Sequence, residues 1–152
     1  MTEREQLHAV FRPRRARPVA LGVAGVELAV LGGGALLVLP YDGPGTVGWA
    51  DRLGIVTIAV AAAWLLWRLG SVAARPSESG LRVRNLLTGR ELAWAQIVSV
   101  TFGGGGPWVL LDLADGDTLA VMAVQRADGA FGQAEATRLA TLVALHSRTT
   151  RG

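Results

Sequence analysis

Two apolar runs decide the fold of this chain: VALGVAGVELAVLGGGALLVL at Val19–Leu39 and LGIVTIAVAAAWLLW at Leu53–Trp67, separated by the insert Pro40–Arg52. The first run has 21 residues and one ionisable group, Glu27. At about 1.5 Å per residue, a helix of this length reaches about 30 Å, the thickness of a hydrocarbon core. Because lipid offers the backbone no hydrogen-bond partner, such a run is expected to be helical. The pattern therefore predicts a transmembrane hairpin.

The second run is long enough to span a membrane only if Arg68 snorkels to the surface and Leu69–Ala74 completes the helix. The hairpin is thus predicted over 19–74, with helices at about 19–39 and 53–74. A cleaved signal peptide is disfavoured, because no small-x-small cleavage site follows the first run. A buried pair of helices in a soluble protein is disfavoured too, because neither run has a polar stripe.

Charge predicts the orientation of the hairpin. The leader Met1–Pro18 holds five arginines against two glutamates, whereas Ser77–Gly152 holds seven arginines and seven acids. An arginine excess beside a span favours a cytoplasmic leader in contact with anionic lipid, and it does not indicate a nucleic-acid-binding face. The insert is net negative, and Arg75, Arg82 and Arg84 follow the second helix. We expect a multi-pass plasma-membrane protein with both termini and the C-terminal domain in the cytoplasm.

Glu27 is unusual because it is an ionisable residue deep inside the first apolar run. An isolated charge at that depth costs about 2–3 kcal/mol, so we predict a Glu27–Arg68 polar pair, direct or through water. The alternative is a proton or ion relay. A relay needs a second polar station, and Thr57 is the other hydrogen-bonding side chain deep in either run.

Small residues recur on the first run. Gly25, Ala29 and Gly33 repeat at four-residue spacing and line one helix face. Such a face permits close helix contact. The contact is predicted either within the hairpin or between protomers.

After Pro76 the pattern changes from helix to strand. Five short antiparallel strands are predicted, joined by turns such as Leu87-Thr88-Gly89 and Asp115-Gly116. They cover about 81–84, 90–94, 97–102, 108–113 and 117–124. In the third strand, alternation places Val98, Val100 and Phe102 on one face.

The chain closes with a predicted amphipathic helix, Asp128–Arg148, for which Asp128 is the candidate N-cap. One charge, Glu135, interrupts its apolar face. The sequence therefore predicts an α+β membrane protein with a leader at 1–18, a helical hairpin at 19–74 and a small domain at 77–152.

The C-terminal domain resembles the bacterial pleckstrin-homology (PH)-like domains. The segments that carry the resemblance are Gly80-Leu81-Arg82-Val83-Arg84, then Arg90–Ile97, then Asp115-Gly116. Two helices followed by such a domain resemble the small actinobacterial membrane proteins grouped with low-molecular-weight protein antigen six. The resemblance implies an antiparallel sheet, typically of seven strands, closed by the last helix. It further implies a binding or scaffolding role and no enzymatic activity.

The residue types present limit the chemistry that the chain is expected to perform. The chain has no cysteine, and His8 and His146 lie at opposite ends of the sequence. The glycines at 103–106 lack the lysine of a phosphate loop, and Asp115 and Asp117 fit an ordinary hairpin turn. We expect no catalytic residue, no metal and no cofactor.

The expected function is a non-enzymatic, membrane-anchored PH-like interaction or scaffold module. Its expected partners are membrane lipids and a protein at the membrane. One alternative is an anionic lipid headgroup-binding module that uses Arg82, Arg84 and Arg90. Another is an accessory subunit of a transporter or envelope-assembly complex, which would dock on the face of Gly25, Ala29 and Gly33.

Overall fold

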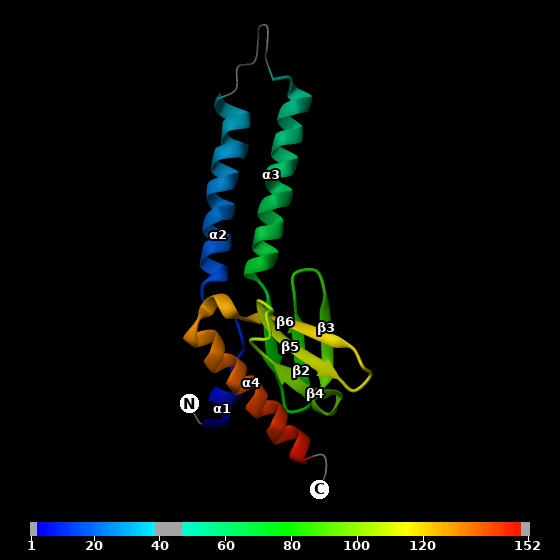
Figure 1. Ribbon diagram of the computed structural model, residues 1–152. Helices are drawn as coiled ribbons and strands as arrows, with labels where there is room; N and C mark the ends of the chain where they lie inside the picture. Colours follow the sequence, from blue (N-terminus) through cyan, green and yellow to red (C-terminus); the bar gives the residue numbers. More distant parts are fainter. Residues whose placement is uncertain (1–2, 39–46, 150–152) are drawn as a thin grey trace. The chain divides into compact units, whose positions relative to one another are not determined.

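The computed structural model describes residues 3–38 and 47–149 (Figure 1). The chain divides into two compact units: Ala16–Ser71, a helical hairpin, and Met1–Arg15 together with Val72–Gly152, a β-domain. The leader was predicted as a segment of its own at 1–18, but its first 15 residues belong to the same compact unit as the β-domain. Most of the predicted insert, at 40–46, lies outside the described residues.

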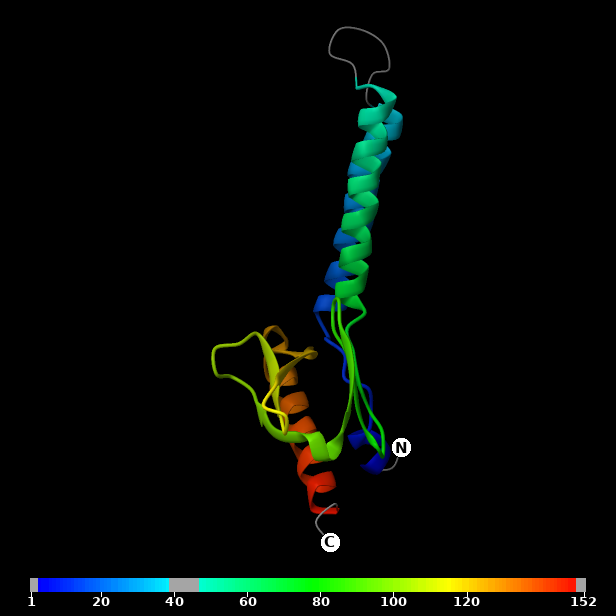
Figure 2. The same cartoon turned by 90° about the vertical axis from the view of Figure 1, so that its right-hand side faces the viewer.

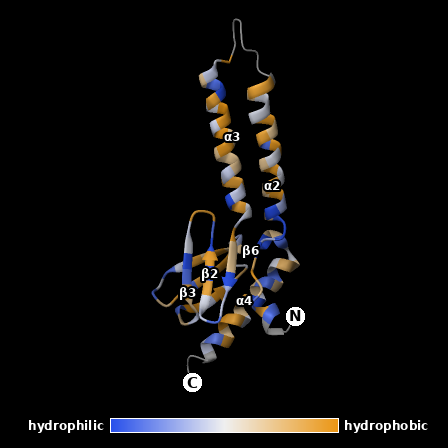
Figure 3. Cartoon of the chain, turned by 180° about the vertical axis from the view of Figure 1, so that it is seen from behind, coloured by the Kyte–Doolittle hydropathy of each residue, from blue (hydrophilic) through white to orange (hydrophobic). Residues whose placement is uncertain are grey.

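The hairpin consists of two long apolar helices (Figure 3). Its first helix, α2 (Ala16–Glu27), continues into the π-helical segments η1 (Leu28–Gly32) and η2 (Gly34–Val38). Its second helix is α3 (Trp49–Gly70). The stretches Ala16–Leu37 and Trp49–Gly70 have 22 residues each, long and apolar enough to cross a membrane.

The second helix was predicted over 53–74, but it begins and ends four residues earlier, because the chain after Ser71 turns into a strand.

Small side chains fill the interior of the hairpin. Ala20, Ala24 and Ala35 are buried on the first helix, and Ala59, Ala63 and Gly70 are buried on α3. A Cβ atom at Gly70 would lie 3.5 Å from the Arg17 carbonyl oxygen and 3.7 Å from the Ala20 Cβ. The two helices therefore approach closely because their facing side chains are small.

The β-domain contains two three-stranded antiparallel sheets, ordered β1-β2-β3 and β4-β5-β6. The first sheet comprises β1 (Ala73–Pro76), β2 (Gly80–Arg84) and β3 (Gly89–Ala93). The second comprises β4 (Ile97–Thr101), β5 (Trp108–Leu113) and β6 (Thr118–Gln125). The 3-10 turn η3 (Trp94–Gln96) joins the sheets, and η4 (Arg126–Asp128) precedes α4 (Ala130–Thr149).

One apolar core lies between the two sheets and α4 (Figure 2). Burial alternates along β5, where Val109, Leu111 and Leu113 point inward, as a strand with one covered face requires. The prediction for β4 is partly wrong, because Val98 is exposed. A register shift between Ile97 and Ser99 forms a β-bulge there and turns Val98 out of the pleat.

The leader completes the first sheet. The Phe11 amide donates to the Ala74 carbonyl oxygen (2.9 Å), and the Ala74 amide donates to that of Phe11 (3.1 Å). Phe11 is fully buried, and burial then alternates to Arg14, as in a strand. The five predicted strands thus become six, and Phe11 adds a seventh paired position. In chain order, the whole hairpin is inserted between Phe11 and β1.

Candidate functional site

Three arginines share the outer face of the first sheet. Arg75 lies opposite Arg82, which lies opposite Glu91, and Arg84 lies opposite Ala73. Directly opposed residues of antiparallel strands share a face, and all three arginines are exposed. The Arg82 Nε lies 3.3 Å from a Glu91 carboxylate oxygen, with 64% and 72% of the two side chains exposed. Water screens such a pair strongly.

A fourth arginine joins this face from the leader. The antiparallel bridge between Phe11 and Ala74 places Arg12 beside Ala73. Because Phe11 points inward, strand alternation points Arg12 outward, and Arg12 is exposed. We call these four residues the arginine face: Arg12, Arg75, Arg82 and Arg84. Among the strand partners of these arginines in the described sheet, the acid is Glu91, so the paired strands carry a net positive charge on this face.

Arg90, predicted to act with Arg82 and Arg84, does not share their face. It lies opposite the buried Val83. Its guanidinium bonds Asp115 (3.0 Å) and Asp117 (3.2 Å) in the turn between β5 and β6. Arg90 therefore joins the edges of the two sheets, and the two aspartates of the predicted turn are its partners.

Arg138 on α4 holds the leader in place. Its Nε and Nη2 bond both carboxylate oxygens of Glu135, at 3.1 and 2.7 Å. Its guanidinium lies 3.7 Å from the centre of the Phe11 ring. Its Nη1 donates to three leader carbonyls, those of Gln6, Leu7 and Ala9. The charge that interrupts the predicted apolar face of the last helix, Glu135, thus orients the arginine that binds the leader.

Asp128 also binds the leader, although it was predicted as the N-cap of the last helix. Its carboxylate accepts the backbone N–H groups of Arg14 and Arg15, both at 3.0 Å. The side chain is buried. The helix begins later, at Ala130, after Gly129 at φ 60°. The sequence around Asp128 contains no pattern that points to a partner more than a hundred residues away.

The two histidines meet in the structure, although they lie at opposite ends of the sequence. The rings of His8 and His146 pack edge to face with centroids 5.7 Å apart. His146 also stacks on Trp94 at 4.5 Å. Within the described residues, no group of three His, Cys, Asp or Glu side chains could hold a metal ion.

Within the hairpin, the predicted direct pair between Glu27 and Arg68 is not formed. Both Glu27 carboxylate oxygens are buried and have no hydrogen-bond partner among the described residues. The Arg68 guanidinium lies 5.8 Å from the centre of the Trp64 ring. Gly70 packs beside Ala20, so Arg68, two residues before Gly70, lies about five residues, or about 7.5 Å of helix, from the level of Glu27.

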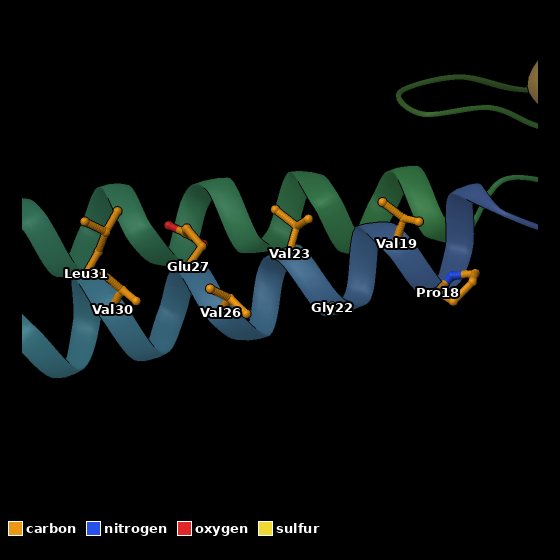
Figure 4. A pocket seen from close by; sticks show the side chains of 8 residues that line it. All are labelled: Pro18, Val19, Gly22, Val23, Val26, Glu27, Val30 and Leu31. Atoms are coloured by element: carbon orange, nitrogen blue, oxygen red, sulfur yellow. The ribbon is translucent and has the colours of Figure 1, made fainter.

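Glu27 lines an apolar groove on its own helix, shown with all its lining side chains in Figure 4. The groove has a volume of about 550 Å³ and runs from Pro18 to Leu31. The predicted packing residues lie elsewhere: Gly25 and Ala29 are exposed and Gly33 is half-buried. Their use between protomers stays a prediction.

Arg52 is a buried cation that sequence reasoning missed. Its Nη1 donates to the carbonyl oxygens of Ala35 (2.9 Å) and Leu36 (3.4 Å). These carbonyls belong to the end of the first helix, where a positive charge is favourable. Arg52 was counted with the insert, but it binds the neighbouring helix end.

Comparison with known proteins finds a family that is similar to the β-domain. The resemblance implied one antiparallel sheet, typically of seven strands, closed by the last helix, whereas the described residues form two three-stranded antiparallel sheets and a C-terminal helix. Residues 72–141 match the family described as the bacterial PH domain. The resemblance found in the sequence is confirmed.

The chain is also similar to curated relatives. It is 32% identical over 103 residues to an uncharacterized protein of Mycobacterium tuberculosis H37Rv and to one of Mycobacterium bovis. The match covers 68% of this chain and 66% of each relative, so the chain spans just under two thirds of their length. No solved structure matches the chain significantly.

Proposed function

We propose that this protein is an integral membrane protein whose hairpin anchors its PH domain at the cytoplasmic face of the plasma membrane. There the domain acts as a non-enzymatic interaction or scaffold module. The observation that carries the proposal is the backbone pairing of Phe11 with Ala74. These residues flank the hairpin, so both of its ends belong to one folded domain. Such a chain crosses a bilayer an even number of times.

The exposure pattern of the hairpin supports the anchor. Large apolar side chains such as Val26, Ile58 and Leu37 are exposed on both helices, whereas the buried residues are mostly alanine. In water such a surface is unfavourable by about 25 cal/mol per Å² of apolar area. In hydrocarbon it costs nothing, because lipid tails are themselves apolar.

Anchoring gives an interaction module a physical advantage. A domain held at the membrane meets its membrane partners at high effective concentration, so each single contact can be weak. The polar clusters around Arg138, Asp128 and Arg90 in the described β-domain hold parts of the fold together.

Cysteine labelling tests the topology directly, because the natural chain has no cysteine. Single cysteines replace Val10 in the leader, Val98 in the PH domain and Thr46 in the connection between the helices. A membrane-impermeant maleimide added to intact cells should label Thr46→Cys and spare the other two. Labelling of Val10→Cys and Val98→Cys without Thr46→Cys would place the domain outside the cytoplasm. Opposite results for Val10→Cys and Val98→Cys would overturn the hairpin anchor.

The arginine face favours a second candidate function, recognition of anionic lipid headgroups. Four arginines and one glutamate on one sheet face provide the net charge for such contact. Arg12 lies four residues before α2, and Arg75 five residues after α3. A chain segment of four or five residues reaches about 13–18 Å at most. The anchor therefore keeps these two arginines close to the bilayer.

Hydrogen exchange of the full chain in nanodiscs tests this candidate. Amides of β1 and β2 should exchange more slowly with phosphatidylglycerol present than in pure phosphatidylcholine. The triple variant Arg75→Ala, Arg82→Ala and Arg84→Ala should lose the difference, and Arg90→Ala should keep it. Equal exchange in both lipids contradicts headgroup recognition and leaves the anchor intact.

A further inference from the structure

The two turns of the first sheet carry opposite kinds of side chain. The turn between β1 and β2, Ser77–Ser79, consists of two serines and Glu78, and all three residues are exposed. The turn between β2 and β3 instead has Leu86 and Leu87 at its tip, and Leu87 is 69% exposed. Because β2 has five residues, the turns lie about 15–17 Å apart. One end of the sheet is therefore polar and acidic, and the other is apolar.

Strand register places the apolar turn at the end of the sheet from which both connections to the hairpin leave. Arg84, the last residue of β2, lies opposite Ala73, the first residue of β1. Ala73 comes three residues after α3 ends at Gly70, and Arg12, on its other side, comes four residues before α2. A segment of three or four residues reaches about 10–14 Å at most. A membrane-spanning hairpin therefore holds this end of the sheet, and the turn that extends beyond it, near the bilayer surface.

The apolar turn has a well-bonded base. The Asn85 backbone N–H donates to the Thr88 carbonyl oxygen at 2.8 Å and closes the turn. The Asn85 side chain is buried and connects the turn to β6. Its Nδ2 donates to the Ala120 carbonyl oxygen at 2.7 Å, and its Oδ1 accepts the Met122 backbone N–H at 3.1 Å. These bonds fix the turn to the second sheet while Leu87 stays outside the core.

A second exposed apolar residue lies beside the other connection to the hairpin. Phe131, in the first turn of α4, is 36% exposed, and the Arg14 guanidinium lies 5.6 Å from the centre of its ring. Asp128 binds the backbone N–H groups of Arg14 and Arg15, and Arg15 directly precedes α2. Exposed arginines thus accompany the two apolar residues at this end of the β-domain: Arg12, Arg14, Arg15 and Arg84.

Resting on the membrane anchor proposed above, we propose that Leu87 and Phe131 insert into the bilayer surface and hold the β-domain against the membrane that its hairpin spans. Apolar side chains at such a surface reach the acyl chains, while neighbouring arginines contact lipid phosphates. The polar turn Ser77–Ser79 stays in water. This contact differs from headgroup recognition by the arginine face, because its apolar part needs no anionic lipid.

Charge complementarity favours lipid over a second copy of this chain as the partner. In a symmetric contact, a second copy would bring its own Arg14 and Arg84 to the same surface, and like charges would oppose the contact. Phospholipids carry a phosphate in every headgroup, so they offer partners to these arginines and an apolar layer to Leu87 at the same time.

Quenching of a dye by lipid tests the contact in the full chain. The natural chain has no cysteine, so an environment-sensitive dye is attached to single cysteines at Thr88, Ser79 or Ile58. The vesicles contain phosphatidylcholine brominated on its acyl chains, which quenches a dye that contacts these chains. The dye at Thr88→Cys, beside Leu87, should be quenched, and the dye at Ser79→Cys should not. Ile58 is an exposed residue of α3, so Ile58→Cys reports whether the hairpin spans the bilayer.

Variants separate the apolar contact from the rest of the surface. Leu87→Gln keeps the approximate size of the side chain and removes its apolar end. It should lower the ratio of quenched to unquenched dye at Thr88→Cys by about tenfold, the scale of burying one leucine side chain. Phe131→Ala should act in the same direction. Val98→Gln is the matched control, because Val98 is 66% exposed on β4, and it should leave the quenching unchanged.

The outcomes distinguish this inference from the proposed function. Equal quenching at Thr88→Cys and Ser79→Cys, or quenching that survives Leu87→Gln combined with Phe131→Ala, overturns the apolar contact. Quenching that requires added phosphatidylglycerol assigns the contact to the arginines and also overturns it. Quenching at Ile58→Cys without quenching at Thr88→Cys refutes the docking and leaves the anchor standing. An unquenched dye at Ile58→Cys refutes the anchor itself.

Discussion

The hairpin and the PH domain are built in opposite ways. In the hairpin the buried residues are small, as at Ala24 and Ala59, and the exposed ones are large and apolar. In the PH domain large apolar residues such as Leu111 and Leu139 are fully buried, and arginines lie outside. The first arrangement suits lipid, where close packing of small residues associates helices. The second suits water, where burial of apolar area drives folding. Each region thus indicates the solvent expected around it.

The largest effect on stability is expected at Phe11. A substitution there tests whether the leader is part of the folded PH domain. Phe11→Ala removes a fully buried ring, and such changes cost about 3–5 kcal/mol. We expect the PH domain to unfold at much lower temperature, as followed by β-sheet circular dichroism of the full chain in mild detergent. The neighbouring exposed residue gives the control: Val10→Ala should change little. Equal stability of Phe11→Ala and the natural chain would remove the leader from the domain.

Two equally exposed valines, one in each region, test whether the hairpin surface meets lipid and the PH domain surface meets water. Val26 in the hairpin and Val98 in the PH domain are both 66% exposed. Val26→Arg should oppose membrane insertion by about 3 kcal/mol, whereas Val98→Arg should be tolerated, as surface changes usually are. The membrane-bound fraction of each variant in cells gives the measurement. If both variants insert equally well, the exposed face of the hairpin does not meet lipid.

A smaller effect is expected at Arg138, the polar residue that joins leader and helix. Arg138→Met keeps the apolar stem but leaves the Glu135 carboxylate and three leader carbonyls without this donor. We expect a loss of about 2 kcal/mol. The double variant Glu135→Gln and Arg138→Met should recover part of the loss, because the unpaired charge is gone. Thermal unfolding of the three chains in one detergent provides the comparison.

The elements that the sequence predicted correctly are those whose positions follow from hydrophobic periodicity. The hairpin, the positions of five strands and the last helix all follow from patterns of period 3.6 or 2 within short windows. The sequence missed β1, because Ala73 and Ala74 continue the apolar run of the second helix. A strand there forms only because Phe11 and β2 pair with it on either side, and a local window does not contain those partners.

The site residues were harder to predict for the same reason. Arg82 and Arg84 share a strand, so alternation placed them on one face correctly. Arg90 follows closely in sequence but bonds the turn at Asp115, a contact that depends on how the two sheets face each other. Asp128 and Arg138 act on a leader more than a hundred residues away. For these residues, the local composition resembles any helix start or salt-bridged helix face.

The smallest effect separates two exposed arginines that the sequence grouped together. Arg82 makes one contact, with Glu91, across an open sheet face, whereas Arg90 bonds two aspartates. Exposed pairs contribute about 0.2–1 kcal/mol, so Arg82→Ala should cost less than about 0.5 kcal/mol and Arg90→Ala close to 1 kcal/mol. Denaturant unfolding of the PH domain in the full chain measures both. A larger loss at Arg82 than at Arg90 would mean that Arg82 holds the fold, and its place on an open binding face would lose its support.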